Sequence, residues 1–596
     1  MRTFSNPRLD NSASLSEGPR GNLADDLVRR ATEHPDASCL SRQDADGWHD
    51  VSAREVRREV LALARGLFAA GVRVGDRVVL CSGTRYEWTL LDYACWEVGA
   101  VVVPVYSSSP VEHLRHVLAD SGAIAAVVET KDAYAELDAS SIESLRWVWP
   151  IESGGLDDLV ALGAEVDDAD IDHCRASVRS ESLATLLYTS GTTATPRGCA
   201  LSHGNLSSEL DAVIESLPEL FTSPDAATLL VLPLPHVLAR LVQTGCVRAG
   251  VRLGHSTGAD LHTDLKSFRP TFLVGVPRVL ESLADAASER AHASGRGAVF
   301  GRAAEAAIAH SRARTAGRAS LLLRARHTAY ERRVYRQLRA DLGGRTRWLV
   351  SCGAPLRERQ AHFFAGIGLP VLEGYALTES AGPVCVNTPD DIRIGSVGQP
   401  LPGTTVRVAD DGELLFRGPQ VFRGYWRGSG EPVDEPADGW LQTGDLGEID
   451  GEGFVRITGR AQEILVTAGG KQVAPGVLEE QLRANPLVDQ VMVVGDGRPY
   501  LVALVTLHAV AARQWARVHG AGTSPRALAT NPDLLAEIRA SVDAANEQVS
   551  PAEAIRHFTV LPAAWTEASG HLTPTARVRR QAVLRDFADD VEALYL

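Results

Sequence analysis

Lysine is nearly absent from this sequence of 596 residues. Lys131, Lys266 and Lys471 are the only lysines, so 57 of the 60 basic residues are arginine. A coding bias accounts for most of this deficit, because the two residues serve equally well on a solvated surface. At a catalytic position the exchange matters more, since an ammonium is a compact, mobile charge whereas a guanidinium is a flat, permanently charged fork.

An excess of positive charge, a cysteine framework and long apolar runs are also lacking. The 75 acidic residues bring the net charge to −15, which argues against broad nucleic-acid binding. The eight cysteines are scattered, with no CxxC pair and no His/Cys cluster at zinc spacing, so structural metal and disulfide frameworks are not expected. Residues 1–22 form a polar leader without the apolar core of a signal peptide, and no apolar run reaches the roughly 18 residues that span a bilayer. We therefore predict a cytoplasmic protein without a transmembrane segment.

Helical and strand patterns alternate along the chain, which is typical of βα units around largely parallel sheets. Residues 280–342 are rich in Ala, Arg and Leu with few breakers, and they predict two or three helices. Thirteen arginines lie between positions 290 and 345. They form either a solvated helix face or a surface for coenzyme phosphates or for peripheral contact with an anionic membrane. The expected helices and strands outside this stretch are 23–33, 53–70, 77–80, 100–105, 228–232, 271–276, 348–351, 370–373, 412–416, 453–458, 490–494 and 500–507.

The most informative motif is the hydroxyl-rich loop YTSGTTATPRG at residues 188–198. Glycine and small hydroxyl residues allow backbone N–H groups to turn inward, so that such a loop can wrap a polyphosphate. It lacks the GxxxxGK[ST] spacing of a Walker A loop. Taken alone, a loop of this composition is more often a plain turn than a phosphate site.

Three further segments strengthen a nucleotide interpretation. In GYALTES (374–380) an aromatic ring could stack on a base, and a carboxylate four residues later could hold Mg²⁺ against phosphate oxygens. In WLQTGD (440–445) a carboxylate after a glycine turn can accept both ribose hydroxyl protons. The arginine of TGRAQE (458–463) can contact sugar or phosphate, and the glycine-rich loop AGGK (468–471) follows it.

In this order and spacing the four segments resemble the adenylate-forming superfamily of acyl-CoA synthetases, peptide-synthetase adenylation domains and luciferases, over about residues 23–596. The segments PLPHVLAR (233–240), GAPL (353–356) and LTP (572–574) look most like the bacterial long-chain fatty-acyl-CoA synthetase branch. The resemblance implies an α/β fold. Its large N-terminal adenylating domain, residues 23–461, has two αβ-layered subdomains plus a distorted β-barrel. A small, mobile α+β lid domain, residues 462–596, follows the hinge at Gln462.

The resemblance also implies an ATP-dependent, AMP-forming ligase. A carboxylate attacks the α-phosphorus of ATP·Mg²⁺ to give acyl-AMP and pyrophosphate, and the thiol of CoA then displaces AMP. Within this scheme residues 189–193 cradle the β/γ-phosphates, Thr378 contacts the α-phosphate, Tyr375 stacks on adenine, and Asp445 and Arg460 fix the ribose. The residues that the resemblance assigns to ATP are Thr189, Ser190, Gly191, Thr192, Thr193, Arg197, Gly353, Ala354, Tyr375, Asp445 and Arg460. Those assigned to catalysis are Thr378, Glu379 and Arg577, and Glu379 is also the expected Mg²⁺ ligand. The substrate pocket is expected to include His236 and Gly374, and CoA or another acceptor is expected to meet Gly469, Gly470 and Lys471.

Four positions depart from the family pattern. Ala194 replaces a usual glycine, Arg197 a usual lysine, and Gln462 a usual lysine or aspartate. Arg577 stands where the family places the catalytic lysine that touches the acyl carboxylate. This arginine reflects either the general coding bias or a specialisation for another substrate, because its fork is wider than an ammonium.

Three functions are compatible with these motifs. The first is a fatty or aromatic acyl-CoA ligase. The second is a diazotase, similar to relatives in bacterial antibiotic and other natural-product pathways, which would adenylate nitrite and pass the nitroso group to an aromatic amine such as an aminobenzoic or aminocinnamic acid. The third is a nucleotide-binding pseudo-enzyme, against which the retention of Glu379, Asp445 and Arg460 speaks.

Overall fold

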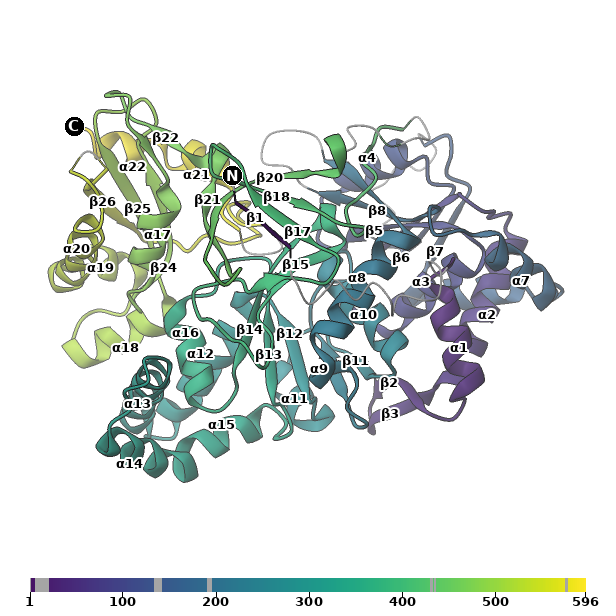
Figure 1. Cartoon of the computed structure of the whole chain (residues 1–596), viewed down its shortest axis with the longest axis horizontal. Coiled ribbons are helices and arrows are strands. Elements are labelled where there is room, and N and C mark those ends of the chain that lie inside the picture. The colour runs from purple at the N-terminus through teal and green to yellow at the C-terminus, as the bar shows by residue number, and fades with distance from the viewer. Residues whose placement is uncertain are drawn as a thin grey trace.

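The structure is a computed structural model that describes residues 2–5, 21–132, 142–189, 196–428, 432, 436–551, 553–573 and 577–596. Two large sheets with helices packed around them form the N-terminal part, and a smaller α+β unit lies at the other end of the chain (Figure 1). The predicted α/β class, with a large N-terminal and a small C-terminal domain, is confirmed.

The first large sheet has seven strands in the order β19-β9-β8-β5-β4-β6-β7 within the described ranges. The pairs within β8-β5-β4-β6-β7 are parallel, and β9 and β19 add antiparallel pairs at one edge. Its strands are β4 (Arg77–Ser82), β5 (Val101–Tyr106), β6 (Ala125–Val128), β7 (Trp147–Pro150), β8 (Leu183–Thr189), β9 (Arg197–Ser202) and β19 (Tyr425–Trp426). Around it are α1 (Ala24–Glu33), α2 (Ala53–Ala69), α3 (Tyr86–Glu97), α4 (Val111–Ser121), α6 (Gly155–Leu162), α7 (Asp168–Ser177) and α8 (His203–Ser216).

The second large sheet has nine strands in the order β16-β15-β14-β13-β12-β10-β11-β2-β3 among the described residues. Its central strands, from β14 to β2, are parallel. Its strands are β2 (Ser38–Asp44), β3 (Gly47–Ser52), β10 (Ala227–Leu230), β11 (Arg252–His255), β12 (Phe272–Gly275), β13 (Trp348–Ser351), β14 (Val371–Leu377), β15 (Gly382–Val386) and β16 (Gln399–Pro400). Helices that accompany it are α9 (Pro218–Phe221), α10 (Val237–Ala249), α11 (Leu261–Phe268) and α16 (Glu358–Gly366).

The helical stretch predicted over residues 280–342 is more divided than expected. It contains α12 (Pro277–Ala293), α13 (Gly297–Thr315), α14 (Leu321–Tyr330), a π-helical turn (Glu331–Tyr335) and α15 (Arg336–Asp341). The break between α13 and α14 coincides with Gly317, whose φ of +66° is a left-handed conformation that glycine adopts at low cost. A single glycine within an otherwise helical pattern was too weak a signal to place this break.

The region predicted to form the distorted β-barrel contains, among the described residues, a five-stranded antiparallel sheet in the order β1-β17-β18-β20-β21. Its strands are β1 (Arg2–Ser5), β17 (Thr405–Val408), β18 (Glu413–Arg417), β20 (Leu441–Ile449) and β21 (Val455–Arg460). Strand β1 belongs to the polar leader and pairs with β17, which the sequence did not predict. Four residues without apolar alternation give no strand signal of their own.

The C-terminal unit packs helices on a three-stranded sheet, β24-β25-β26, beside the short hairpin β22-β23. Its strands are β22 (Leu465–Val466), β23 (Gln472–Val473), β24 (Val488–Val494), β25 (Leu501–Leu507) and β26 (Ile555–Leu561). Its helices are α17 (Pro475–Arg483), α18 (Ala509–His519), α19 (Pro525–Ala529), α20 (Pro532–Asn546), α21 (Arg580–Asp586) and α22 (Ala588–Ala593). None of the helices in the described ranges combines the length and the apolar character that a bilayer crossing requires.

A buried ion pair joins the layers of the two large sheets. Asp92 in α3 lies 2.9 Å from the guanidinium of Arg240 in α10, and the Gln243 amide donates to its other oxygen at 2.8 Å. Both charged side chains are almost fully buried. Burial raises the pKa of Asp92, and Arg240 and Gln243 oppose that shift by stabilising the charged carboxylate. The charged form of the buried Asp92 carboxylate therefore depends on the presence of Arg240 and Gln243.

We predict that Arg240→Met lowers the free energy of unfolding by about 3–5 kcal/mol, because it leaves the Asp92 carboxylate buried without its cation. Urea unfolding followed by tryptophan fluorescence measures the change. The matched control is Arg54→Met, which removes an exposed partner of Asp36 and should cost less than about 1 kcal/mol. Equal effects of the two substitutions would contradict the prediction.

Candidate active site

The candidate site lies at one edge of the nine-stranded sheet, where neighbouring parallel strands end. Strands β13 and β14 are paired in parallel, so the residues that follow them emerge together. Gly353 and Ala354 follow β13, whereas Thr378 and Glu379 form a 3₁₀ turn (Thr378–Ser380) after β14. His236 follows β10 of the same sheet and caps α10. Ligands of open α/β sheets bind at this edge, beyond the carboxyl ends of the strands.

Arg577 of the C-terminal unit contacts this edge directly. Its Nε and Nη2 donate to the carbonyl oxygen of Gly353 at 3.0 and 2.8 Å. The Thr573 hydroxyl accepts from the backbone N–H of Arg577 at 3.0 Å. The Thr573 N–H donates to the Arg577 carbonyl oxygen at 2.8 Å. The structure thus places the arginine that replaces the usual lysine against a loop of the N-terminal domain.

His236 lies within the electrostatic range of Arg577 and remains neutral. Burial, followed by repulsion from Arg577, lowers the pKa of His236 to about 4. Its Nδ1 accepts from the Leu238 N–H at 3.2 Å, so the proton of the neutral ring is on Nε2. At neutral pH this histidine offers a hydrogen-bond donor without a positive charge.

Asp445 connects two other predicted residues. Its register partner across β20 and β21 is Arg460, whose Nε lies 2.8 Å from Asp445 Oδ1. The Tyr375 hydroxyl donates to Asp445 Oδ2. Burial, followed by the charge of Asp445, raises the pKa of Tyr375 well above its usual value. Both carboxylate oxygens thus have protein donors, and each retains a lone pair that a ribose hydroxyl could use.

Glu379 links this edge to the other large sheet. The Tyr425 hydroxyl donates to Glu379 Oε1 at 2.8 Å, and the guanidinium carbon of Arg197 lies 3.9 Å from the centre of the Tyr425 ring. Arg197 is opposite Thr189 in the β8–β9 ladder. Both ends of the predicted phosphate loop are therefore held next to the carboxylate that is predicted to bind Mg²⁺.

The residues at Glu379 suit a magnesium ion that is brought in with a nucleotide. Mg²⁺ is usually held by one or two carboxylates together with substrate phosphates and water. Glu379 supplies one carboxylate, and the Tyr425 hydroxyl occupies only one of its oxygens. Among the described residues, no three His, Cys, Asp or Glu side chains gather as a ready-made metal cage.

The remaining predicted residues either lie outside the described residues or belong to other elements of the fold. Ser190, Gly191, Thr192 and Thr193, together with Ala194, lie outside the described residues. Gly469, Gly470 and Lys471 form the turn of the β22–β23 hairpin, where the Lys471 ammonium pairs with Glu553 at 3.1 Å within the C-terminal unit. Gln462 lies in a 3₁₀ turn (Ala461–Glu463) after β21. Their assigned roles stay predictions.

Gly374 lies inside β14 rather than on an open wall. A Cβ atom there would be 2.9 Å from Cys352 Sγ and 3.0 Å from the Cys385 carbonyl oxygen, so a side chain does not fit. Its neighbour Glu373 accepts from the Leu356 N–H at 3.1 Å, and burial raises the pKa of Glu373 to about 8.

Sequence reasoning missed two residues at the site. Tyr425 contacts both Glu379 and Arg197, and Glu373 lies two residues before Tyr375 on the same strand. Tyr425 is 46 residues from Glu379, so no spacing rule connects them. The aromatic pair Tyr425-Trp426 after a glycine was the one local signal available.

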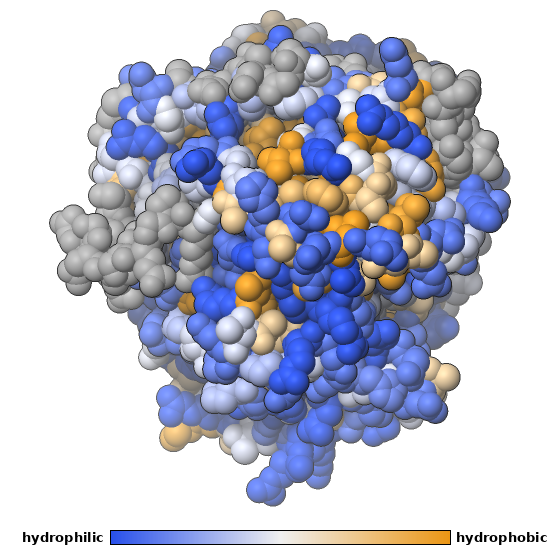
Figure 2. Space-filling model, turned by 90° about the vertical axis from the view of Figure 1, so that its right-hand side faces the viewer, coloured by the Kyte–Doolittle hydropathy of each residue, from blue (hydrophilic) through white to orange (hydrophobic). Residues whose placement is uncertain are grey.

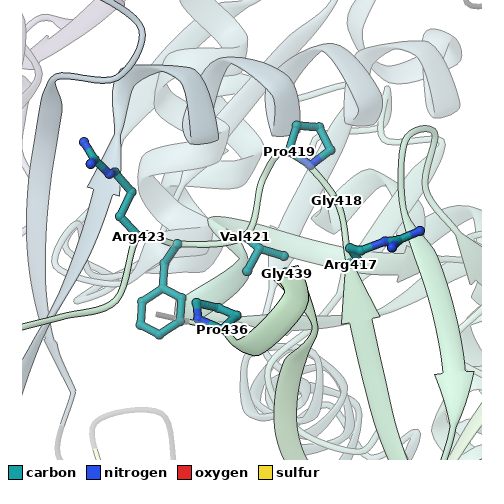
Figure 3. Close-up of a pocket in the computed structure, with 8 residues that line it drawn as sticks. Arg417, Gly418, Pro419, Val421, Arg423, Pro436 and Gly439 are labelled. Carbon is teal, nitrogen blue, oxygen red and sulfur yellow. The ribbon is translucent and has the colours of Figure 1, made fainter. Parts of the chain in front are cut away.

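A hollow of about 550 Å³ lies beside this region (Figure 3). Arg417 and Arg423 extend from opposite ends of it, and the residues between them are apolar or glycine. Phe422, which lines it, donates its backbone N–H to the Glu379 carbonyl at 2.8 Å. Its described lining lacks a carboxylate or imidazole, so we place the candidate site at the strand ends.

We predict that Asp445→Asn weakens ATP binding about tenfold or more, because the amide cannot accept from Arg460, Tyr375 and a ribose as a carboxylate does. Isothermal titration calorimetry gives the affinity. Glu448→Gln is the matched control, since Glu448 is an exposed carboxylate on the same strand. An unchanged ATP affinity in Asp445→Asn would refute the role of Asp445.

Two family models together cover most of the chain. The model of the AMP-binding enzyme family matches residues 27–426, and the model of the AMP-binding enzyme C-terminal domain matches residues 462–596. Long-chain-fatty-acid–CoA ligase FadD15 of Mycobacterium bovis is 45% identical over 604 residues, which cover 100% of both chains. FadD15 of Mycobacterium tuberculosis is 44% identical with the same coverage.

Solved structures share the fold at lower identity. The anthranilate CoA ligase AuaEII, in complex with anthranoyl-AMP, superposes with a TM-score of 0.71 at 19% identity, covering 97% of this chain and 99% of that one. The o-succinylbenzoate CoA synthetase MenE of Bacillus subtilis gives a TM-score of 0.68 at 19% identity, covering 94% and 97%. The chain belongs to the AMP-binding enzyme family and lies, among the adenylate-forming enzymes, near the fatty-acyl-CoA synthetase branch.

Proposed function

We propose that the protein is a long-chain fatty-acyl-CoA synthetase, an AMP-forming ligase that uses ATP, Mg²⁺ and CoA. The observation on which this proposal rests most is the meeting of Arg577, Gly353 and His236 beside the pair of Asp445 and Arg460. This arrangement offers a place for a carboxylate next to a place for a nucleoside. The full-length similarity to FadD15 ligases supports a fatty acid as the substrate.

The residues at the edge have distinct tasks in this reaction. The Arg577 charge and the Nε2–H of His236 would hold the carboxylate of the acid, and Asp445 would hold the ribose. Glu379 and Arg197 lie at the polyphosphate end, where Mg²⁺ would neutralise charge on the leaving pyrophosphate. Positioning and charge stabilisation of this kind are the main contributions of a protein to phosphoryl and adenylyl transfer.

The C-terminal unit is proposed to act as a lid that turns about Gln462. In the present arrangement Arg577 faces Gly353, whereas the Lys471 hairpin has its ion pair within its own unit. This suits the adenylation step. Delivery of CoA by Gly469, Gly470 and Lys471 would then require the lid to rotate, with residues 23–461 and 462–596 moving as two domains.

The alternative functions have less support. Neither the relatives nor the site geometry favours nitrite over a carboxylate or an aromatic amine over CoA. The pseudo-enzyme hypothesis gives no role to Glu379 as a magnesium ligand, because a module that only binds a nucleotide does not need one. The acyl-CoA synthetase is therefore the function that the site supports best.

We expect the purified enzyme to form AMP from ATP when palmitic acid and CoA are supplied together, and to form palmitoyl-CoA in equal amount. Liquid chromatography of the nucleotides and thioester measures both products. Nitrite with aminobenzoic acid, tested in parallel with an azo-coupling dye, should give no AMP above background. AMP formation from nitrite and amine alone would overturn the proposal.

We predict that Arg577→Lys lowers kcat/KM for adenylation about tenfold, because one ammonium cannot make the two hydrogen bonds that the guanidinium donates to the Gly353 carbonyl. Pyrophosphate exchange measures this step without CoA. Arg579→Lys, two positions along on an exposed side chain, is the control. A rate that rises in Arg577→Lys would mean that the arginine is a handicap rather than a fitted part of the site.

A further inference from the structure

The helices inserted between β12 and β13 bear a charge opposite to that of the whole chain. Residues 296–336 contain ten arginines and two glutamates, whereas the net charge of the protein is −15. All ten arginines are exposed. They are Arg296, Arg302, Arg312, Arg314, Arg318, Arg324, Arg326, Arg332, Arg333 and Arg336.

Neighbouring carboxylates do not neutralise this charge. The two glutamates of the segment, Glu305 and Glu331, pair with Arg359 and Arg339, which lie outside the set of ten. No ion pair connects any of the ten arginines to an acid in the described part of the chain. The pKa of His310 is lowered by burial and then by its neighbours His327, Arg314 and Arg324, as expected where positive charges crowd.

Two leucines stand out of the same surface. Leu321 and Leu322, the first two residues of α14, are each 82% exposed, and α14 has no buried residue. They follow the turn from α13 and are flanked in sequence by Arg318 and Arg324. Single exposed leucines are common on protein surfaces. An adjacent pair at the tip of a helical hairpin, set among unpaired arginines, is the pattern of an interfacial membrane contact.

The position of the hairpin leaves it accessible. Figure 1 shows α13 and α14 at one corner of the molecule, at the opposite end from α2 and α7. Figure 2 shows the face at that opposite end, where an apolar patch is surrounded by hydrophilic residues. Exposed apolar residues from this end include Val74, Trp147, Val160 and Leu162. Arginines also lie near them in the sequence, but Arg57 pairs with Glu97 and Arg65 with Asp168, so unpaired positive charge distinguishes the two ends.

We propose that α13, α14 and the turn between them, which we call the arginine–leucine surface, dock on a bilayer that contains anionic phospholipids. Leu321 and Leu322 would insert among the headgroups, and the six arginines of this surface, Arg302, Arg312, Arg314, Arg318, Arg324 and Arg326, would contact lipid phosphates. RNA would satisfy the arginines but would give the leucine pair no apolar environment. The docking is separate from the proposed ligase function, because it requires neither ATP nor a fatty acid.

Vesicle flotation with the full chain tests this inference. We expect binding to vesicles of phosphatidylcholine with phosphatidylglycerol, and at least about tenfold weaker binding to phosphatidylcholine alone. Salt near 1 M, where the Debye length is about 3 Å, should release most of the protein. The Leu321→Glu/Leu322→Glu and Arg318→Glu/Arg324→Glu variants should each bind anionic vesicles at least about tenfold less, with unchanged thermal midpoints.

Matched controls come from the opposite end of the molecule. Leu162→Glu changes a leucine that is 44% exposed on α6, which packs against α2, and Arg54→Glu/Arg58→Glu reverses two exposed charges on α2. Both controls should bind like the wild type. The inference is overturned if the wild type does not bind anionic vesicles at low salt, if it binds a single-stranded RNA instead, or if the controls lose binding as the hairpin variants do.

Discussion

The parallel pairing within the nine-stranded sheet determines where the candidate site of this protein lies. Parallel strands all end at the same edge, so loops that are far apart in the sequence are brought together there. The loops after β10, β13 and β14 deliver His236, Gly353 and Glu379 to one place. The same topology buries the strands on both faces, and this is why they read as short continuous apolar runs. The burial of the strands and the position of the candidate site therefore both follow from the parallel pairing.

Electrostatics divides this edge into two environments. At one end Arg577 is the cation, and its repulsion together with burial keeps His236 neutral. An acid bound there would meet one charged donor and one neutral donor instead of two cations that repel each other. At the other end Glu379 and Arg197 both contact Tyr425, so a polyphosphate and its metal ion would find opposite charges there. This separation suits a reaction in which a carboxylate attacks at one end and pyrophosphate, also negatively charged, leaves at the other.

The sequence predicted the elements and residues that obey local rules. Buried strands such as β13, at residues 348–351, were identified from their apolar runs, and motif order identified Asp445, Arg460 and Glu379. Pairings across long separations could not be predicted in this way. Asp92 and Arg240 are 148 residues apart on two different helices, and the strand at Arg2–Ser5 depends wholly on its partner β17. Neither feature leaves a periodic signal in its own segment, because the stabilisation comes from the partner.

The contacts of Arg577 change the interpretation of the scarcity of lysine. A coding bias could replace lysine by arginine throughout the surface without consequence, as it could at Arg197, where the flat cation lies over the Tyr425 ring. At Arg577 two nitrogens of the guanidinium converge on one carbonyl oxygen, a contact that a single ammonium would make with one bond. The Gly353 carbonyl therefore accepts from two nitrogens of the guanidinium, a contact that depends on the arginine. A bias in composition can become a structural requirement when a neighbouring backbone group adjusts to the residue that the bias supplies.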